Sequence, residues 1–371
     1  MTFFKSISFS LALFFLFSCL STRAQTIRTY SNEFLSLGVG ARGLGMGNAQ
    51  AASVADVTAG FWNPAGLAQI TGTQVAAMHA EWFAGIAKYD YAGAAFPISD
   101  KKRFLAINAI RFGVDDIPNT LFLIEPDGNI NYDNITTFSA ADYALLLSYA
   151  QKIKKVSVGG SVKVIHRRVG SFATAWGFGL DLGIQYAPNN RFTLGAMLKD
   201  ATTTVNTWGF NFTPEEKQQL ELTDNVIPVN SVELTGQRLI LGGAYRQPFG
   251  QSKIALLTEL NFDITFDGKR NTLIKSDPIS IDPHAGIELE YNNLIFLRTG
   301  INNIQEFRND TNGASFTSIQ PNVGLGVKIK EVRIDYAFTG LNRVSDGIYS
   351  HIISLMIDFG KHTKEPAATN N

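Results

Sequence analysis

The chain has 371 residues, of which 45% are apolar, and its 32 basic residues balance its 32 acidic residues. A neutral chain is not expected to bind nucleic acid, which requires a strongly basic surface. The length would hold two or three soluble domains of about 150 residues, or one membrane β-barrel of about 14 strands of about 10 residues each. No Pro- or Ser-rich linker divides residues 73–359, so no domain boundary is marked there.

Residues 1–24 have the pattern of a secretory signal peptide, with a positive start, an apolar core at residues 7–20 and small residues before the cut. An alternative is a lipoprotein cut before Cys19. Phe17 is bulky for that site, so we favour cleavage after Ala24. This cleavage removes the only cysteine, and the mature chain would have no disulfide or thiol chemistry. No later run of about 18 apolar residues remains, so any membrane crossing must be made by strands.

Residues 25–72 are rich in glycine and alanine and do not have the pattern of membrane strands. The glycine cluster lacks the spacing of a phosphate-binding loop and is not followed by alternating strands and helices. We interpret these glycines as points where the backbone passes close to a barrel wall, whose many inward Gly and Ala positions leave room for an insert. Asn63 before Pro64 favours a turn. The motif residues of this insert are Gly43, Gly45, Gly47, Trp62, Asn63, Pro64, Ala65 and Gly66.

Residues 73–360 are predicted to form the barrel, because strand follows strand and the connections alternate between short and long. Two connections of the long set, at residues 84–88 and 169–173, are exceptions because they are short. The even strand number returns the chain to the side of the short turns, and residues 361–371 are expected to be a disordered tail. The fourteen predicted strands are residues 73–83, 89–97, 104–113, 140–150, 156–168, 174–186, 192–199, 238–246, 253–262, 282–290, 294–302, 320–328, 332–338 and 349–359.

Each predicted strand has one apolar and one polar face, as a wall between lipid and a wet lumen requires. A soluble β-sandwich would also alternate. The barrel is favoured because strands end at the short turns on outward aromatic residues, which form the girdle expected at a membrane interface. This girdle comprises Tyr149, Tyr186, Tyr245, Tyr291 and Phe359, and the opposite rim is expected at Tyr89, Tyr91, Tyr143, Trp176 and Tyr349.

A short helix is predicted in the longest outer loop, residues 201–237. Thr213, Pro214 and Glu216 form the pattern of a capping box with proline at the first helical position. The helix is either a lid or partner-docking element, or a means of compacting the loop. The apolar face of such a lid would be supplied by Phe210, Phe212, Leu220 and Leu222.

No catalytic, cofactor or metal site is predicted. The histidines are scattered without a pair at i,i+4 spacing. Asp127, Asn129 and Asp133 resemble part of a calcium loop, but Tyr132 occupies the position where such a loop needs glycine, and we interpret the segment as a turn-rich loop. We therefore expect a non-enzymatic protein.

The runs Gly40–Gly47 and Trp62–Leu67 together resemble the PorV/PorQ family of outer-membrane proteins, which is similar to the FadL long-chain fatty-acid transporters. The resemblance implies an all-β fold, a 14-stranded antiparallel transmembrane barrel whose N-terminal hatch, here residues 25–72, folds into the lumen. It also implies location in the outer membrane of a Gram-negative bacterium of the Bacteroidota, in contact with outer-membrane lipid. The role implied first is that of a type IX secretion component that binds secreted cargo or translocon partners. The alternative is a FadL-like transporter of hydrophobic small molecules, in which Phe61 and Trp62 would contact the ligand.

Overall fold

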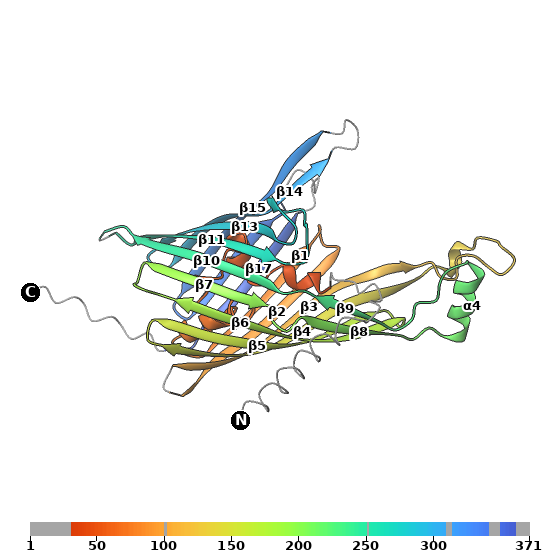
Figure 1. The fold of residues 1–371 in the computed structure, drawn as a ribbon, viewed down its shortest axis with the longest axis horizontal. Helices are drawn as coiled ribbons and strands as arrows, with labels where there is room; N and C mark the ends of the chain where they lie inside the picture. The colour runs from red at the N-terminus through yellow and green to blue at the C-terminus, as the bar shows by residue number, and fades with distance from the viewer. Residues whose placement is uncertain (1–30, 100–101, 251, 309–313, 341–348, 361–371) are drawn as a thin grey trace, which may run out of the picture.

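A closed antiparallel β-barrel surrounds residues 31–72 in the computed structural model (Figure 1). The structure describes residues 31–99, 102–250, 252–308, 314–340 and 349–360. The predicted signal peptide (1–24) and the predicted tail (361–371) lie outside the described residues. Within the described residues, no helix combines the length and the apolar character needed to cross a bilayer.

Seventeen strand segments form one sheet, which closes because β1 pairs with both β2 and β17. The segments are β1 (Gln74–Trp82), β2 (Ala87–Ser99), β3 (Arg103–Asn119), β4 (Thr136–Ile153), β5 (Val156–Val169), β6 (Ala173–Tyr186), β7 (Phe192–Lys199), β8 (Thr204–Phe210), β9 (Ser231–Thr235), β10 (Arg238–Pro248), β11 (Ile254–Thr265), β12 (Ile274–Lys275), β13 (Ser280–Tyr291), β14 (Ile295–Arg308), β15 (Ser315–Ile329), β16 (Val332–Thr339) and β17 (Ser350–Asp358).

The wall has fourteen strands, as predicted, because three of the seventeen segments are not separate strands of the wall. Segments β7 and β8 both pair with β6 and are one interrupted strand, and β9 and β10 are the two parts of the next strand. Segment β12 pairs only with the end of β13. The prediction that residues 201–237 form an outer loop with a helix but no strand was therefore wrong in part, since β8 and β9 continue the wall there.

The break between β7 and β8 explains why this continuation escaped the sequence pattern. Asp200 and Thr203 both have positive φ, of 56° and 57°, so the alternation of faces is lost across the break. Buried ion pairs hold the break in place, because Lys163 Nζ lies 2.8 Å from Asp181 and 2.6 Å from Asp200.

The barrel is apolar outside and polar inside, which is the reverse of a soluble β-sandwich. Leu182, Val162 and Leu355 point outward and are 44%, 52% and 42% exposed. In contrast, inward side chains such as Asn108 and Ser161 are buried. The outward face therefore matches the apolar belt of a membrane barrel.

The aromatic girdle is confirmed at the short-turn end but only in part at the other rim. Tyr149, Tyr186, Tyr291 and Phe359 are exposed on the outer face, and Tyr245 is half-buried there. At the opposite rim, Tyr143, Trp176 and Tyr349 are exposed as predicted. The prediction was wrong for Tyr89 and Tyr91, which are buried in the lumen, because the outward positions of β2 are those of Lys88, Asp90, Ala92 and Ala94.

The hatch consists of short helical segments inside the barrel, shown in red and orange in Figure 1. These are η1 (Glu33–Ser36), α2 (Ala41–Gly45), α3 (Ala59–Trp62) and η2 (Pro64–Gln69). Helix α2 packs against β14, β15 and β16, and η2 packs against β4, β5 and β6. The hatch therefore contacts opposite parts of the wall.

The predicted helix in the longest outer connection is confirmed as α4 (Pro214–Leu222). Thr213 Oγ1 accepts a hydrogen bond from the Glu216 N–H while the Glu216 carboxylate accepts one from the Thr213 N–H, which is the predicted capping box. The predicted apolar face of the lid was wrong in its helical part. Leu222 is exposed and the buried residue is Gln219, whose amide donates to the Ile124 carbonyl of the β3–β4 connection at 2.6 Å.

Candidate functional site

The motif residues of the hatch lie where the hatch touches the wall. A Cβ atom on Gly43 would lie 2.9 Å from the Trp62 ring, and Gly45 lies against the backbone of Gly324 in β15. Gly47 has a φ of +62°, and a Cβ there would lie 2.7 Å from the Ile301 nitrogen in β14. Only glycine permits these close approaches.

Asn63 joins the two halves of the hatch and ties them to the wall. Its side-chain N–H donates to the Ala51 carbonyl at 2.7 Å and to the Ile184 carbonyl of β6 at 3.2 Å, while its oxygen accepts from the Ala65 N–H at 3.2 Å. Pro64 and Ala65 follow directly and lie against Gly159 of β5, and Gly66 lies against the Val54 carbonyl. The Asn-Pro-Ala-Gly turn thus positions the hatch.

Six charged side chains form a continuous series of ion pairs that runs from the hatch through the wall and back to the hatch. We call this series the ion network. Its members are, in order, Arg42, Glu288, Arg298, Asp335, Arg333 and Asp56, and the successive N–O distances are 3.0, 2.6, 2.7, 2.8 and 2.9 Å. Because the signs alternate, the network is neutral as a whole and each buried charge has a partner.

The network affects the ionisation of its two hatch members. Burial alone would raise the pKa of the Asp56 carboxyl, but Arg333 and Arg42 outweigh burial and hold the pKa below the ordinary 3.8. Burial alone would lower the pKa of Arg42, but the Glu288 carboxylate outweighs it and the pKa is raised. Both groups therefore remain charged at neutral pH.

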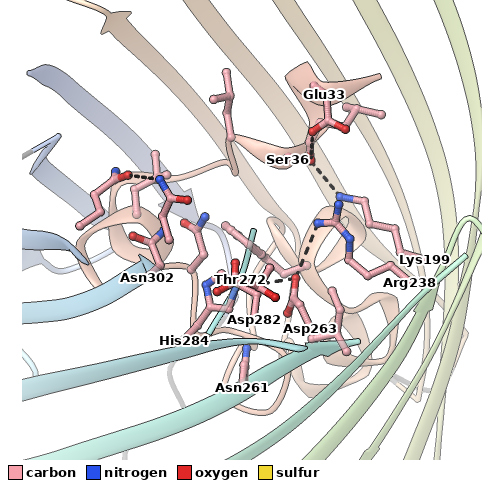
Figure 2. A pocket seen from close by; sticks show the side chains of 18 of the residues that line it. Glu33, Ser36, Lys199, Arg238, Asn261, Asp263, Thr272, Asp282, His284 and Asn302 are labelled. Carbon is pink, nitrogen blue, oxygen red and sulfur yellow. Dashed lines mark hydrogen bonds and ion pairs between the residues drawn. The ribbon is translucent and has the colours of Figure 1, made fainter. Parts of the chain in front are cut away.

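The hatch divides the interior of the barrel into two cavities. The one toward the long connections, which we call the lumenal cavity, has a volume of about 500 Å³ (Figure 2). The one toward the short turns has a volume of about 520 Å³. A small cavity of about 20 Å³ also lies between the hatch and the wall at Gly40 and Ala41.

The two predicted ligand contacts, Phe61 and Trp62, both line the lumenal cavity. Trp62 Nε1 donates to the Val39 carbonyl at 2.9 Å, and Phe61 packs edge-on against Trp62 at 5.0 Å between ring centroids. Lys199 of β7 covers Phe61, with its ammonium 4.4 Å from the ring centroid. Their role in binding stays a prediction.

Most of the other residues that line the lumenal cavity are polar. Figure 2 shows Asn261, Asp263, Asp282, His284 and Asn302 gathered on one side, with Lys199 and Arg238 on another. The charged side chains that line this cavity come in both signs. Among the residues that the structure describes, no group of three or more His, Cys, Asp or Glu side chains is arranged to hold a metal ion.

A further cavity, which is apolar and has a volume of about 900 Å³, lies at the outer end of the barrel, among the β3–β4, β5–β6 and β8–β9 connections. We call it the outer cavity. Its aromatic rings form a series in which Phe138 and Phe172 are 5.3 Å apart, Phe172 and Phe212 5.8 Å, and Phe212 and Phe210 6.3 Å. Phe210 and Phe212 were predicted to lie on the apolar face of a lid, but the cavity itself was not predicted. Its rings come from β4, β8 and two connections that are far apart in the sequence.

The outer cavity reaches the first described residues of the hatch. Glu233, which lines the cavity, accepts a hydrogen bond from the Ser31 hydroxyl at 3.0 Å, and Thr235 accepts one from the Asn32 amide at 2.9 Å. Glu33, two residues after Ser31, lines the lumenal cavity. The start of the hatch therefore lies between the two cavities.

Comparison with solved structures identifies the fold as that of FadL-like outer-membrane barrels. The chain is similar to the CymD monoaromatic hydrocarbon channel, with a TM-score of 0.55 and 14% identity over 88% of this chain and 99% of that one. It is similar to the toluene transporter TbuX of Ralstonia pickettii, with a TM-score of 0.51 and 14% identity over 87% and 98% of the two chains. A FadL homologue of Pseudomonas aeruginosa gives a TM-score of 0.51 and 12% identity over 91% and 99%. No protein-family model and no curated protein matches the sequence.

Proposed function

We propose that this protein is a non-enzymatic channel of the Gram-negative outer membrane that admits small molecules with a hydrophobic part. The apolar outer face and the aromatic girdle support the membrane location. Two of the structures that it resembles are a monoaromatic hydrocarbon channel and a toluene transporter. The observation that carries the proposal is the outer cavity, where apolar and aromatic side chains enclose about 900 Å³, a volume suited to a small ligand.

The proposed route runs from the outer cavity to the lumenal cavity and then past the hatch. A ligand in the outer cavity lies next to Glu233, which holds the hatch at Ser31. The lumenal cavity offers the aromatic rings of Phe61 and Trp62. Because the hatch lies between the lumenal cavity and the cavity toward the short turns, passage requires the hatch to move.

Substitution of Phe212 by serine tests this proposal. Phe212 lines the outer cavity, so Phe212→Ser places a hydroxyl among apolar rings and is expected to slow uptake of toluene by at least about threefold, since the ring supplies roughly 1 kcal/mol or more of apolar contact. Uptake is measured in a strain that lacks the protein and is complemented with each variant. Leu222→Ser is the matched control, because Leu222 is exposed on α4 and does not line the cavity. Equal uptake with and without the protein would reject the channel.

Binding of a secretion partner is a second candidate, and one observation favours it. Large apolar side chains are exposed on the outer connections, with Val226 at 90%, Tyr132 at 71% and Ile130 at 60%. Exposed apolar residues of this kind are typical of surfaces that contact another protein. The test is purification from native membranes, in which type IX translocon or cargo proteins should accompany the wild type and be lost with Val226→Ser and Tyr132→Ser together. Recovery of the barrel without such proteins would count against this candidate.

A further inference from the structure

We propose that the lumenal cavity binds a neutral hydrogen-bonding group of the ligand, so that the preferred substrate is an apolar skeleton carrying a hydroxyl or amide rather than a plain hydrocarbon. This inference rests on the proposed channel function and narrows its substrate class. Plain hydrocarbons can fill the outer cavity, but they cannot satisfy the polar groups that they meet next.

The lining of the lumenal cavity is dominated by uncharged polar side chains. Eight of them are amides, among them Asn48 of the hatch and Asn302 and Asn322 of the wall. An amide side chain both donates and accepts hydrogen bonds. Some of these amides already pair with protein groups, as Asn322 donates to the Asn302 side-chain oxygen at 3.0 Å. A ligand without polar atoms would strip the remaining polar groups of water and leave them unpaired, at a cost of about 1–3 kcal/mol for each group fully buried.

Six residues that line the cavity have a buried polar atom without a protein partner. In four of them the whole residue is more than nine-tenths buried, with exposures of 7%, 7%, 1% and 9%. The atoms of these four are Trp82 Nε1, Thr265 Oγ1, Thr339 Oγ1 and His284 Nε2. Buried polar atoms are normally hydrogen-bonded, so these unpartnered atoms mark places where a ligand atom would gain a bond.

His284 shows which kind of ligand atom fits on one side of the cavity. Its Nδ1 lies 3.1 Å from the Gly47 carbonyl and must donate to it, so in the neutral ring Nε2 is an acceptor. Nε2 lies 3.6 Å from an Asp282 oxygen and 3.9 Å from an Asp263 oxygen, beyond hydrogen-bonding distance. Three acceptors therefore converge, and an O–H or N–H of a ligand is the complementary donor.

The cations around the cavity are already engaged, which argues for a neutral ligand group rather than a carboxylate. Lys199 Nζ donates to the Leu35 carbonyl at 2.9 Å and lies over the Phe61 ring. Arg238 lies 3.6 Å from Asp263, and Arg270 is paired with Asp267. A carboxylate would have to displace one of these partners and would also approach Asp263 and Asp282.

The experiment compares toluene, 4-methylphenol and 4-methylbenzoate, which share one skeleton and differ in the polar group. Binding to the full chain in a detergent-free amphipathic polymer is measured by calorimetry, with each ligand corrected for its partition between water and octanol. We expect 4-methylphenol to bind at least about tenfold more tightly than toluene, because a site built for a hydroxyl rejects the analogue that lacks it. We expect 4-methylbenzoate to bind more weakly than 4-methylphenol.

The double variant Thr265→Val, Thr339→Val tests whether the preference for 4-methylphenol over toluene arises in the lumenal cavity. Valine keeps the shape of threonine and removes only hydroxyls that have no protein partner, so folding should be unaffected. The variant should lose at least about threefold of the preference for 4-methylphenol and keep its affinity for toluene. Thr207→Val, on the exposed face of β8, is the matched control and should change neither.

The outcomes separate the inference from the function on which it rests. Equal corrected affinities for toluene and 4-methylphenol, or a preference that the double variant leaves intact, would overturn the inference while the channel stands. Tighter binding of 4-methylbenzoate than of 4-methylphenol would overturn the inference that the ligand group is neutral. If none of the three ligands binds saturably, the proposed function itself fails.

Discussion

Arg42 on the hatch and Glu288 on the wall form a two-pronged ion pair. Arg42 Nε and Nη2 donate to the two carboxylate oxygens of Glu288 at 3.0 and 3.3 Å. Since the same carboxylate also pairs with Arg298 at 2.6 Å, the contact joins the hatch to the ion network inside the wall. A change at this pair should therefore affect how firmly the hatch is held.

Replacement of Arg42 by glutamine should loosen the hatch. Removal of one partner of a buried ion pair costs about 3 kcal/mol, so Arg42→Gln is expected to increase the frequency of open-channel events in planar bilayers. Arg246→Gln is the control, because Arg246 pairs with Glu290 at 2.7 Å but is 47% exposed, and an exposed pair is worth less than about 1 kcal/mol. Equal conductance of the two variants would contradict the claim that the Arg42–Glu288 ion pair holds the hatch in place.

Acid should release the hatch only well below neutral pH. The pKa of Asp56 is lower in the docked hatch than its ordinary value of 3.8, so the docked state binds fewer protons than the free hatch. The stabilisation from Asp56 is therefore complete above the ordinary value and is lost as the pH falls through the lowered pKa. Conductance should be constant from about pH 5 to pH 8 and rise in stronger acid. Asp56→Asn should raise it at neutral pH, and a variant that stays closed would argue against this role of Asp56.

Alanine at the glycines where the hatch touches the wall should displace the hatch, whereas alanine at a glycine with room for a Cβ should not. A Cβ on Gly47 would meet the Ile301 backbone at 2.7 Å, and a Cβ on Gly300 would lie even closer to the Met46 carbonyl carbon and the Gly47 nitrogen. Gly47→Ala and Gly300→Ala should therefore displace the hatch and increase protease cleavage within residues 31–72. Gly243→Ala is the control, since its Cβ would meet only a Leu194 side chain, at 3.8 Å. If Gly47→Ala resists the protease as well as the wild type does, the close packing of Gly47 against Ile301 is refuted.

The outward position of Val162 predicts how the barrel responds to a charge in the membrane. Val162 is 52% exposed near the middle of β5, so Val162→Arg should destabilise folding into lipid vesicles by about 2–4 kcal/mol. Ile153→Arg, at the short-turn end of β4, should cost at most about 1 kcal/mol, because the penalty falls near the interface. Urea titration in vesicles gives both values. Equal costs would mean that the two positions lie at the same membrane depth.

The sequence alone determined the strand number, the apolar outer face, the short-turn girdle and the capped helix α4. These features follow from local rules, since a strand alternates with a period of two and a capping box spans only a few residues. The rules failed where local order is interrupted. The break at Asp200 concealed β8 and β9, and aromatic residues on β2 could not reveal whether Tyr89 and Tyr91 faced lipid or lumen.

The hatch contacts and the cavities were decided by the tertiary structure. The glycines and the Asn63 turn indicated an insert, but not the wall residues that they touch. Arg42 and Glu288 are 246 positions apart, and the rings of the outer cavity come from β4, β8 and two connections. Arg42 meets Glu288 only when β17 pairs with β1 and closes the wall around the hatch, because closure sets which side chains face one another inside the lumen.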